Sequence, residues 1–121
     1  MKLLRHTVVF DAADLDAEST FWAALVDGSV DFKEDDWHTV HVDGEPFVAF
    51  QLAPNHVKPD WPDGEPQQVH LDLHIEDIVA GHEQAIALGA VLLRAAPDLH
   101  AQRGYQVYAD PAGHPFCLCW E

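Results

Sequence analysis

The feature that most constrains the fold of this chain is an internal duplication. At a constant offset of 63 residues, identical residues recur in the two halves, among them Asp14 with Asp77, Ala17 with Ala80, Ala24 with Ala87, and Leu25 with Leu88. In each half, an aspartate that can cap a helix precedes apolar residues at helical spacing, and a glycine follows them. The sequence therefore predicts one structural unit that occurs twice.

The order of the apolar segments predicts the elements of this unit. The first half is expected to contain a strand at 3–10, a helix from Leu15 to before Gly28, and strands at 30–33, 37–42 and 47–52. The second half is expected to contain a strand at 69–75, a helix from 78 to about Leu88, and strands at 90–94, 105–109 and 116–120. We therefore predict the α+β class, with duplicated βαβββ modules.

The chain length and one proline-rich segment predict the domain organisation. A chain of 121 residues is long enough for one domain and too short for two. Four prolines lie within residues 54–67, which indicates a linker. We expect a single domain over 1–121, with a first module at about 1–53 and a second module at about 68–121.

The charge excludes two classes of partner. A formal net charge of −15 with only six lysines and arginines leaves too few cations to bind nucleic acid or an anionic membrane surface. The chain carries no segment typical of a secretory signal or a membrane span, so we expect a cytoplasmic protein. Cys117 and Cys119 would project from the same face of one strand, where a disulfide is strained, so we expect free thiols.

The segment at 69–75 alternates without interruption. Val69, Leu71, Leu73 and Ile75 would share the face that packs on the helices, and His70, Asp72 and His74 would share the opposite face. That polar row would either contact water or line a cavity. The pattern alone leaves both interpretations open.

Three motifs resemble a known superfamily. These are the duplicated order of strand, aspartate, helix and glycine, the segment His70-Leu-Asp-Leu before Asp77, and Tyr108-Ala-Asp-Pro-Ala-Gly-His-Pro-Phe116. Together they are similar to glyoxalase and bleomycin-resistance proteins of the vicinal-oxygen-chelate superfamily, over almost the whole chain. The resemblance implies a curved mixed sheet around a cavity, with the helices on the outside. Metal-dependent members hold an ion there with a His on the first strand and a Glu on the last strand of each half.

The residues at those four positions differ from the superfamily pattern. The resemblance places His70 and Cys117 in the second half, and Thr7 and Gln51 in the first. The adjacent His6 would need an extra residue within 11–13 to reach the cavity. We therefore predict no metal cofactor. If a divalent metal is bound, its ligands would be His70, Cys117 and Gln51, and zinc would suit the thiol.

We expect the protein to bind a small organic molecule in the cavity, as bleomycin-resistance relatives do. The predicted lining residues are Thr7, Gln51, His70, Asp72, His74 and Cys117, with Trp37 and Trp61 nearest the mouth. Asp72 would suit a cationic or hydrogen-bonding ligand. The alternative is a metal-dependent lyase, isomerase or dioxygenase with a non-standard site, so the question of enzymatic activity stays open.

Two further expectations follow from the sequence. A metal-free enzyme could use Asp72 with His70 or His74 as an acid–base pair. Side chains two residues apart on a strand generally lie too far apart for a direct hydrogen bond, which disfavours that mechanism. We also expect a homodimer, because small domains of this resemblance commonly pair.

Overall fold

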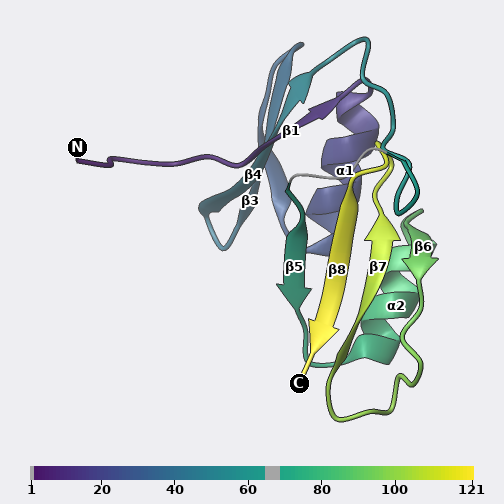
Figure 1. Ribbon diagram of the computed structural model, residues 1–121. Helices are drawn as coiled ribbons and strands as arrows, with labels where there is room; N and C mark the ends of the chain where they lie inside the picture. The colour runs from purple at the N-terminus through teal and green to yellow at the C-terminus, as the bar shows by residue number, and fades with distance from the viewer. Residues whose placement is uncertain (1, 65–68) are drawn as a thin grey trace. The chain divides into compact units, whose positions relative to one another are not determined.

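The computed structural model describes residues 2–64 and 69–121 and divides into two units, Met1–His56 and Val57–Glu121. The first unit contains β1 (Val9–Ala12), α1 (Leu15–Leu25), β2 (Ser29–Lys33), β3 (Trp37–Val42) and β4 (Glu45–Leu52). Its sheet has the order β1-β4-β3-β2, with β1 parallel to β4 and the other pairs antiparallel. Helix α1 packs against β2, β3 and β4 of this sheet (Figure 1).

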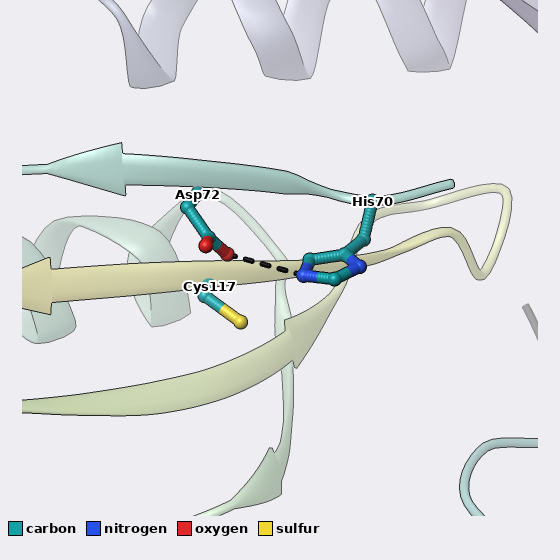
Figure 2. Close-up of side chains that lie close together, drawn as sticks. All are labelled: His70, Asp72 and Cys117. Carbon is teal, nitrogen blue, oxygen red and sulfur yellow. Dashed lines mark ion pairs between the residues drawn. The ribbon is translucent and has the colours of Figure 1, made fainter. Parts of the chain in front are cut away.

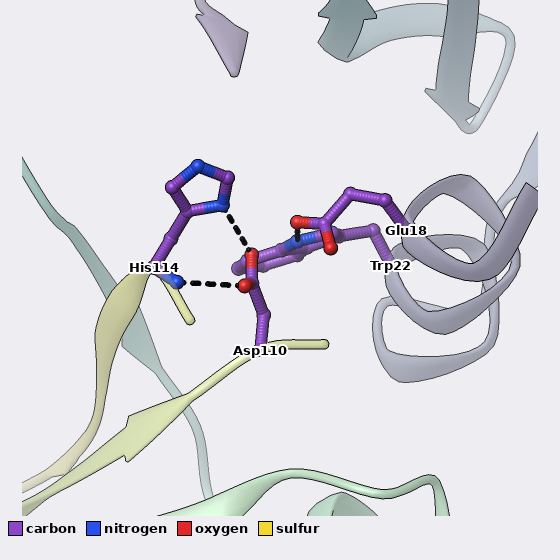
Figure 3. Close-up of polar contacts among 4 residues, drawn as sticks. All are labelled: Glu18, Trp22, Asp110 and His114. Atoms are coloured by element: carbon purple, nitrogen blue, oxygen red, sulfur yellow. Dashed lines mark hydrogen bonds and ion pairs between the residues drawn. The ribbon is translucent and has the colours of Figure 1, made fainter. Parts of the chain in front are cut away.

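The core of the first unit is aromatic. Trp22 of α1 is fully buried, and its ring lies edge-on to Phe10 of β1 and to Phe21, with centroids 5.7 Å apart in both pairs. Phe50 of β4 is also fully buried and lies 6.0 Å from Phe10. The indole Nε1 of Trp22 donates a hydrogen bond to Glu18 one turn earlier, at 3.2 Å (Figure 3), so the buried indole has an acceptor.

The second unit repeats the same order of elements. It contains β5 (Leu71–His74), α2 (Ile78–Ala87), β6 (Val91–Arg94), β7 (Gly104–Ala109) and β8 (Pro115–Trp120). Its sheet has the order β5-β8-β7-β6, with β5 parallel to β8 and the other pairs antiparallel. The predicted α+β class and the duplicated βαβββ modules are confirmed. Neither helix of the described residues has the length and apolar character needed to cross a membrane.

The turn between β7 and β8 is held by one aspartate. The carboxylate of Asp110 accepts hydrogen bonds from the backbone N–H of His114 at 2.8 Å and lies 2.9 Å from the His114 ring Nδ1 (Figure 3). Gly113 has a φ of +91°, and its N–H donates to the Asp110 carbonyl at 2.9 Å. These bonds fix the start of β8 and with it the register of β8 against β7, in which Ala109 pairs with Pro115.

Both first strands are shorter than the sequence predicts. The predicted strand at 3–10 begins only at Val9, and the predicted strand at 69–75 spans Leu71–His74. Leu3 and Leu4 are exposed, and the segment before β1 extends away from its sheet (Figure 1). An apolar segment favours a strand, but a strand also needs a pairing partner, which composition does not supply. Residues 54–64 of the predicted linker form no helix or strand, and its remaining residues, 65–67, lie outside the described residues.

Candidate functional site

The two faces of β5 have different surroundings. Leu71 and Leu73 are half-buried, and the side chain of Ile75, just after the strand, reaches Gly81 of α2. Asp72 and His74 are exposed on the opposite face. Strand β8 lies beside β5 in parallel register, with Cys117 opposite Asp72 and Cys119 opposite His74. Polar side chains of β5 and thiols of β8 therefore share one face of the sheet.

Three of these side chains converge on one point. The ligand atoms of His70, Asp72 and Cys117 lie within 4.8 Å of one another (Figure 2). His70 Nε2 is 3.3 Å from Asp72 Oδ1, and both side chains are about half exposed. This separation is shorter than we expected for side chains two residues apart on a strand. The reason is that His70 precedes the first paired residue of β5, where its ring can turn toward the carboxylate.

The thiol of Cys117 is held in its protonated form. Burial raises the pKa of this thiol to about 12, and the hydrogen bond to the neighbouring Asp72 carboxylate and its negative charge act in the same direction. Burial also raises the pKa of Cys119, with a smaller contribution from Asp72. Both cysteines are free thiols. The cluster therefore brings together the thiol of Cys117, the carboxyl group of Asp72 and the imidazole ring of His70.

A cavity of about 330 Å³ opens beside this cluster, entirely within the second unit. At one side the guanidinium of Arg94 lies 4.9 Å from the ring centroid of Trp61, which is a cation–π distance. The cavity is lined by Trp61, His70, Asp72, Arg94, Tyr105, Val107, Pro115, Phe116, Cys117 and Cys119. It thus combines apolar and aromatic walls with a carboxylate, an imidazole and a cation.

The lining set overlaps only partly with the residues that the sequence singled out. His70, Asp72 and Cys117 line the cavity together, and Trp61 does as well. His74 lies on the same face of β5 but is not among the lining residues. Arg94 was missed, and the only sequence signal for it is that it ends the apolar segment of β6. Tyr105 and Val107 could have been found from the two-residue period of β7.

The remaining predicted residues belong to the first unit. Thr7 is exposed in the segment before β1, and Gln51 is exposed on β4, opposite Asp11. Trp37 begins β3, and its indole donates to Thr39 at 3.1 Å. The pairing of β1 with β4 runs from Val9 to Ala12 without a register shift. Within that strand there is no extra residue to turn His6, which is exposed before the strand.

A more open cavity of about 620 Å³ lies at the start of α1 in the first unit. Its one lysine, Lys33, pairs with Asp16, and the buried His38 ring lies 2.8 Å from Ser19 Oγ. Its lining residues are Ala13, Asp14, Leu15, Asp16, Lys33, Glu34, Asp35, His38 and Leu52. The cluster around Cys117 is therefore the stronger candidate site.

The four metal positions implied by the resemblance do not carry the usual ligands. A hydroxyl at Thr7 and an amide at Gln51 are weak neutral donors, and neither replaces a carboxylate. In the second unit the glutamate position is Cys117, which offers a soft sulfur donor in place of a hard carboxylate. These residues do not fit the two-His, two-Glu set that holds a hard divalent ion.

Comparison with known proteins places this fold in a family. The chain matches the glyoxalase-like domain family over residues 7–119. FosX, a fosfomycin resistance protein from Listeria monocytogenes, shares 13% identity at a TM-score of 0.74, over 100% of this chain and 95% of FosX. A structure of Listeria FosX in complex with Mn(II) and sulfate shares 15% identity at a TM-score of 0.70. The match covers 98% of this chain and 90% of that FosX chain. A glyoxalase-related enzyme from Fulvimarina pelagi shares 23% identity at a TM-score of 0.65. The match covers 98% of this chain and 89% of that enzyme.

These structural similarities confirm the fold. At such low sequence identities they establish neither a ligand nor a reaction for this chain. No protein of curated function matches this sequence. The family match covers almost the whole chain and coincides with both βαβββ modules. The predicted resemblance is confirmed, and the chain belongs to the glyoxalase-like domain family.

Proposed function

We propose that this protein binds a small organic molecule with an anionic group in the cavity of the second unit, without the two-His, two-Glu metal set. The observation that carries the proposal is the guanidinium of Arg94 stacked over Trp61 in the cavity wall. One of only six cationic side chains in a chain of net charge −15 lies at the cavity. A guanidinium binds planar oxyanions through two parallel hydrogen bonds.

The other lining residues of the cavity indicate the chemical character of the rest of the ligand. Val107, Pro115 and Phe116 supply apolar surface, and Tyr105 adds a second aromatic ring beside Trp61. His70 and Asp72 can exchange hydrogen bonds with a hydroxyl or carbonyl group of the ligand. The volume of about 330 Å³ lies at the small end of ligand sites, which suits a compact molecule. The similarity to a fosfomycin resistance protein supports a role in binding a small molecule.

Isothermal titration with four benzene derivatives tests this proposal. All four compounds carry the same benzene ring and differ in the charge of its substituent. Phenylphosphonate and benzoate are anionic, benzamide is neutral, and benzylammonium is cationic. We expect the two anions to bind at least about tenfold more tightly than benzamide, because a charge-assisted hydrogen bond contributes about 1.5–3 kcal/mol. Arg94→Gln should remove this preference.

The matched control is Arg103→Gln, which removes an exposed arginine from the loop between β6 and β7, outside the cavity lining. This variant should keep the preference for anions. Equal binding of benzamide and benzoate to the unmodified protein would contradict the proposal. An equal loss in the two arginine variants would contradict it as well, because general attraction by surface charge would then explain the preference.

A metal-dependent lyase, isomerase or dioxygenase is the second candidate function. The observation that favours it is the convergence of His70, Asp72 and Cys117 at the edge of the same cavity. Fold similarity to relatives that bind Mn(II) is consistent with this candidate but does not identify a reaction.

We also propose that the protein is a cytoplasmic homodimer. Two free thiols suit a reducing compartment. Leu4, Val57 and Val69 are each more than two-thirds exposed and would be covered by a second copy. Light scattering at high micromolar concentration should give twice the chain mass of 13.5 kDa. A mass of one chain under these conditions would refute the dimer.

A further inference from the structure

We propose that His70, Asp72 and Cys117 form a metal site for a borderline or soft divalent cation, with zinc as the expected ion. The site would replace the oxygen-rich ligand set that this chain lacks. All three ligands come from the second unit, so the site needs neither Thr7 nor Gln51. The proposal uses the same cavity as the proposed function and takes Asp72 as its third ligand.

The separations between the three ligand atoms suit a tetrahedral ion. Bonds of about 2.0–2.3 Å to nitrogen, oxygen and sulfur place ligand atoms roughly 3.3–3.8 Å apart in a tetrahedral site. His70 Nε2 and Asp72 Oδ1 are already 3.3 Å apart, and no pair in the cluster exceeds 4.8 Å. Figure 2 shows the side chains directed toward one another, Asp72 from β5, Cys117 from β8 and His70 from the segment leading into β5. A change of side-chain torsion of the kind that ligands commonly make would complete the geometry.

The donor set selects the class of metal. Asp72 and a deprotonated Cys117 would supply two negative charges, which balance one divalent cation. A thiolate with an imidazole favours zinc or cobalt, whereas Mn²⁺ prefers carboxylate, carbonyl and water oxygens. The site therefore prefers a different class of metal from the Mn(II) in the Listeria FosX structure.

Binding of a divalent cation would release the proton of the Cys117 thiol, because a metal binds cysteine as its thiolate. His70 and Asp72 are about half exposed, which gives the ion a route from solvent. Three protein ligands leave a fourth position open toward the cavity, where the anionic group of a ligand could bind.

Cobalt spectroscopy tests the site on chelator-treated protein purified without a metal-affinity tag. Titration with Co²⁺ should give one equivalent of a tetrahedral complex, with intense near-ultraviolet absorption from a cobalt–thiolate bond. Zn²⁺ should displace the cobalt, and a large excess of Mn²⁺ should not. Cys117→Ser should abolish the thiolate absorption, and Asp72→Asn should weaken cobalt binding by roughly tenfold or more.

The matched control is Cys119→Ser, which removes the other cavity thiol on the same strand and should leave the absorption unchanged. Thermal melts of each variant establish that it is folded. Cobalt binding without a thiolate band, displacement by Mn²⁺, or loss of the band in Cys119→Ser but not in Cys117→Ser would overturn the proposal. Phenylphosphonate titration of metal-free protein reports the proposed function separately. A failed metal site therefore leaves anion binding intact, and the reverse also holds.

Discussion

Replacing Phe50 with alanine is expected to lower the free energy of unfolding by about 3–5 kcal/mol, the range for truncating a buried phenylalanine. Phe50 is fully buried at the centre of β4, with Phe10 as its neighbour on β1 and His38 as its neighbour on β3. Its edge-on contact with the Phe10 ring would also be lost. Since small domains are stable by only about 5–15 kcal/mol, this loss is a large fraction of the total. Urea denaturation followed by far-ultraviolet circular dichroism measures it.

Gln51→Ala is the matched control for this experiment. Gln51 is the next residue of β4, and it is exposed. Its truncation should change the free energy of unfolding by less than about 0.5 kcal/mol. A larger destabilisation by Gln51→Ala than by Phe50→Ala would mean that the faces of β4 are reversed. The predicted position of Gln51 on the ligand-binding side would then be wrong too.

The parts of the fold that the sequence predicted are those with local causes. Asp14 and Asp77 each accept a hydrogen bond from the backbone N–H three residues later, at 3.0 Å in both helices. Asp43 and Gly44 both have positive φ, +52° and +80°, which is the conformation of a two-residue hairpin turn. Each of these features depends on residues within one turn of chain, so a sequence pattern identifies it.

The register between distant strands could not be predicted in the same way. Val9 and Asp72 each lie five residues before a helix-capping aspartate, and their partners are Ala49 and Cys117. Ala49 is therefore the first-half counterpart of Cys117, two residues from Gln51. The resemblance instead placed Gln51 at the position that corresponds to Cys117. Pairing between strands depends on turn geometry and packing across the sheet, which a short sequence match does not contain.

The same distinction between local and long-range causes applies to the candidate site. The alternation at 69–75 indicated that His70 and Asp72 share a face, because the two-residue period of a strand is local. The stacking of Arg94 on Trp61 joins β6 to a segment 33 residues earlier, and nothing in either segment indicates it. As a result, the cation that favours an anionic ligand emerged only from the structure. The sequence favoured a cationic or hydrogen-bonding ligand, because Asp72 was the cavity residue from which the charge of the ligand was inferred.

Cys117 in the metal-free protein is expected to react with iodoacetamide at pH 8 roughly fifty-fold more slowly than the same cysteine in the unfolded chain. A thiol with a pKa of about 12 is about 10⁻⁴ thiolate at pH 8, whereas an ordinary cysteine is about a tenth to a quarter thiolate. The more basic thiolate is intrinsically more nucleophilic, which offsets part of this difference of about a thousandfold. Peptide mapping by mass spectrometry of the Cys119→Ser variant, with and without urea, measures the ratio.

Asp72→Asn distinguishes the two causes of the slow reaction. The substitution removes the negative charge and weakens the acceptor, so the pKa of Cys117 should fall and its alkylation should accelerate. Burial is the largest cause of the raised pKa and persists in the variant, so the rate should stay below that of the unfolded chain. Glu83→Gln removes a carboxylate from the exposed surface of α2 and should leave the rate unchanged. If native Cys117 reacted as fast as the unfolded chain, neither burial nor Asp72 would hold its pKa above the ordinary value, and this prediction would be wrong.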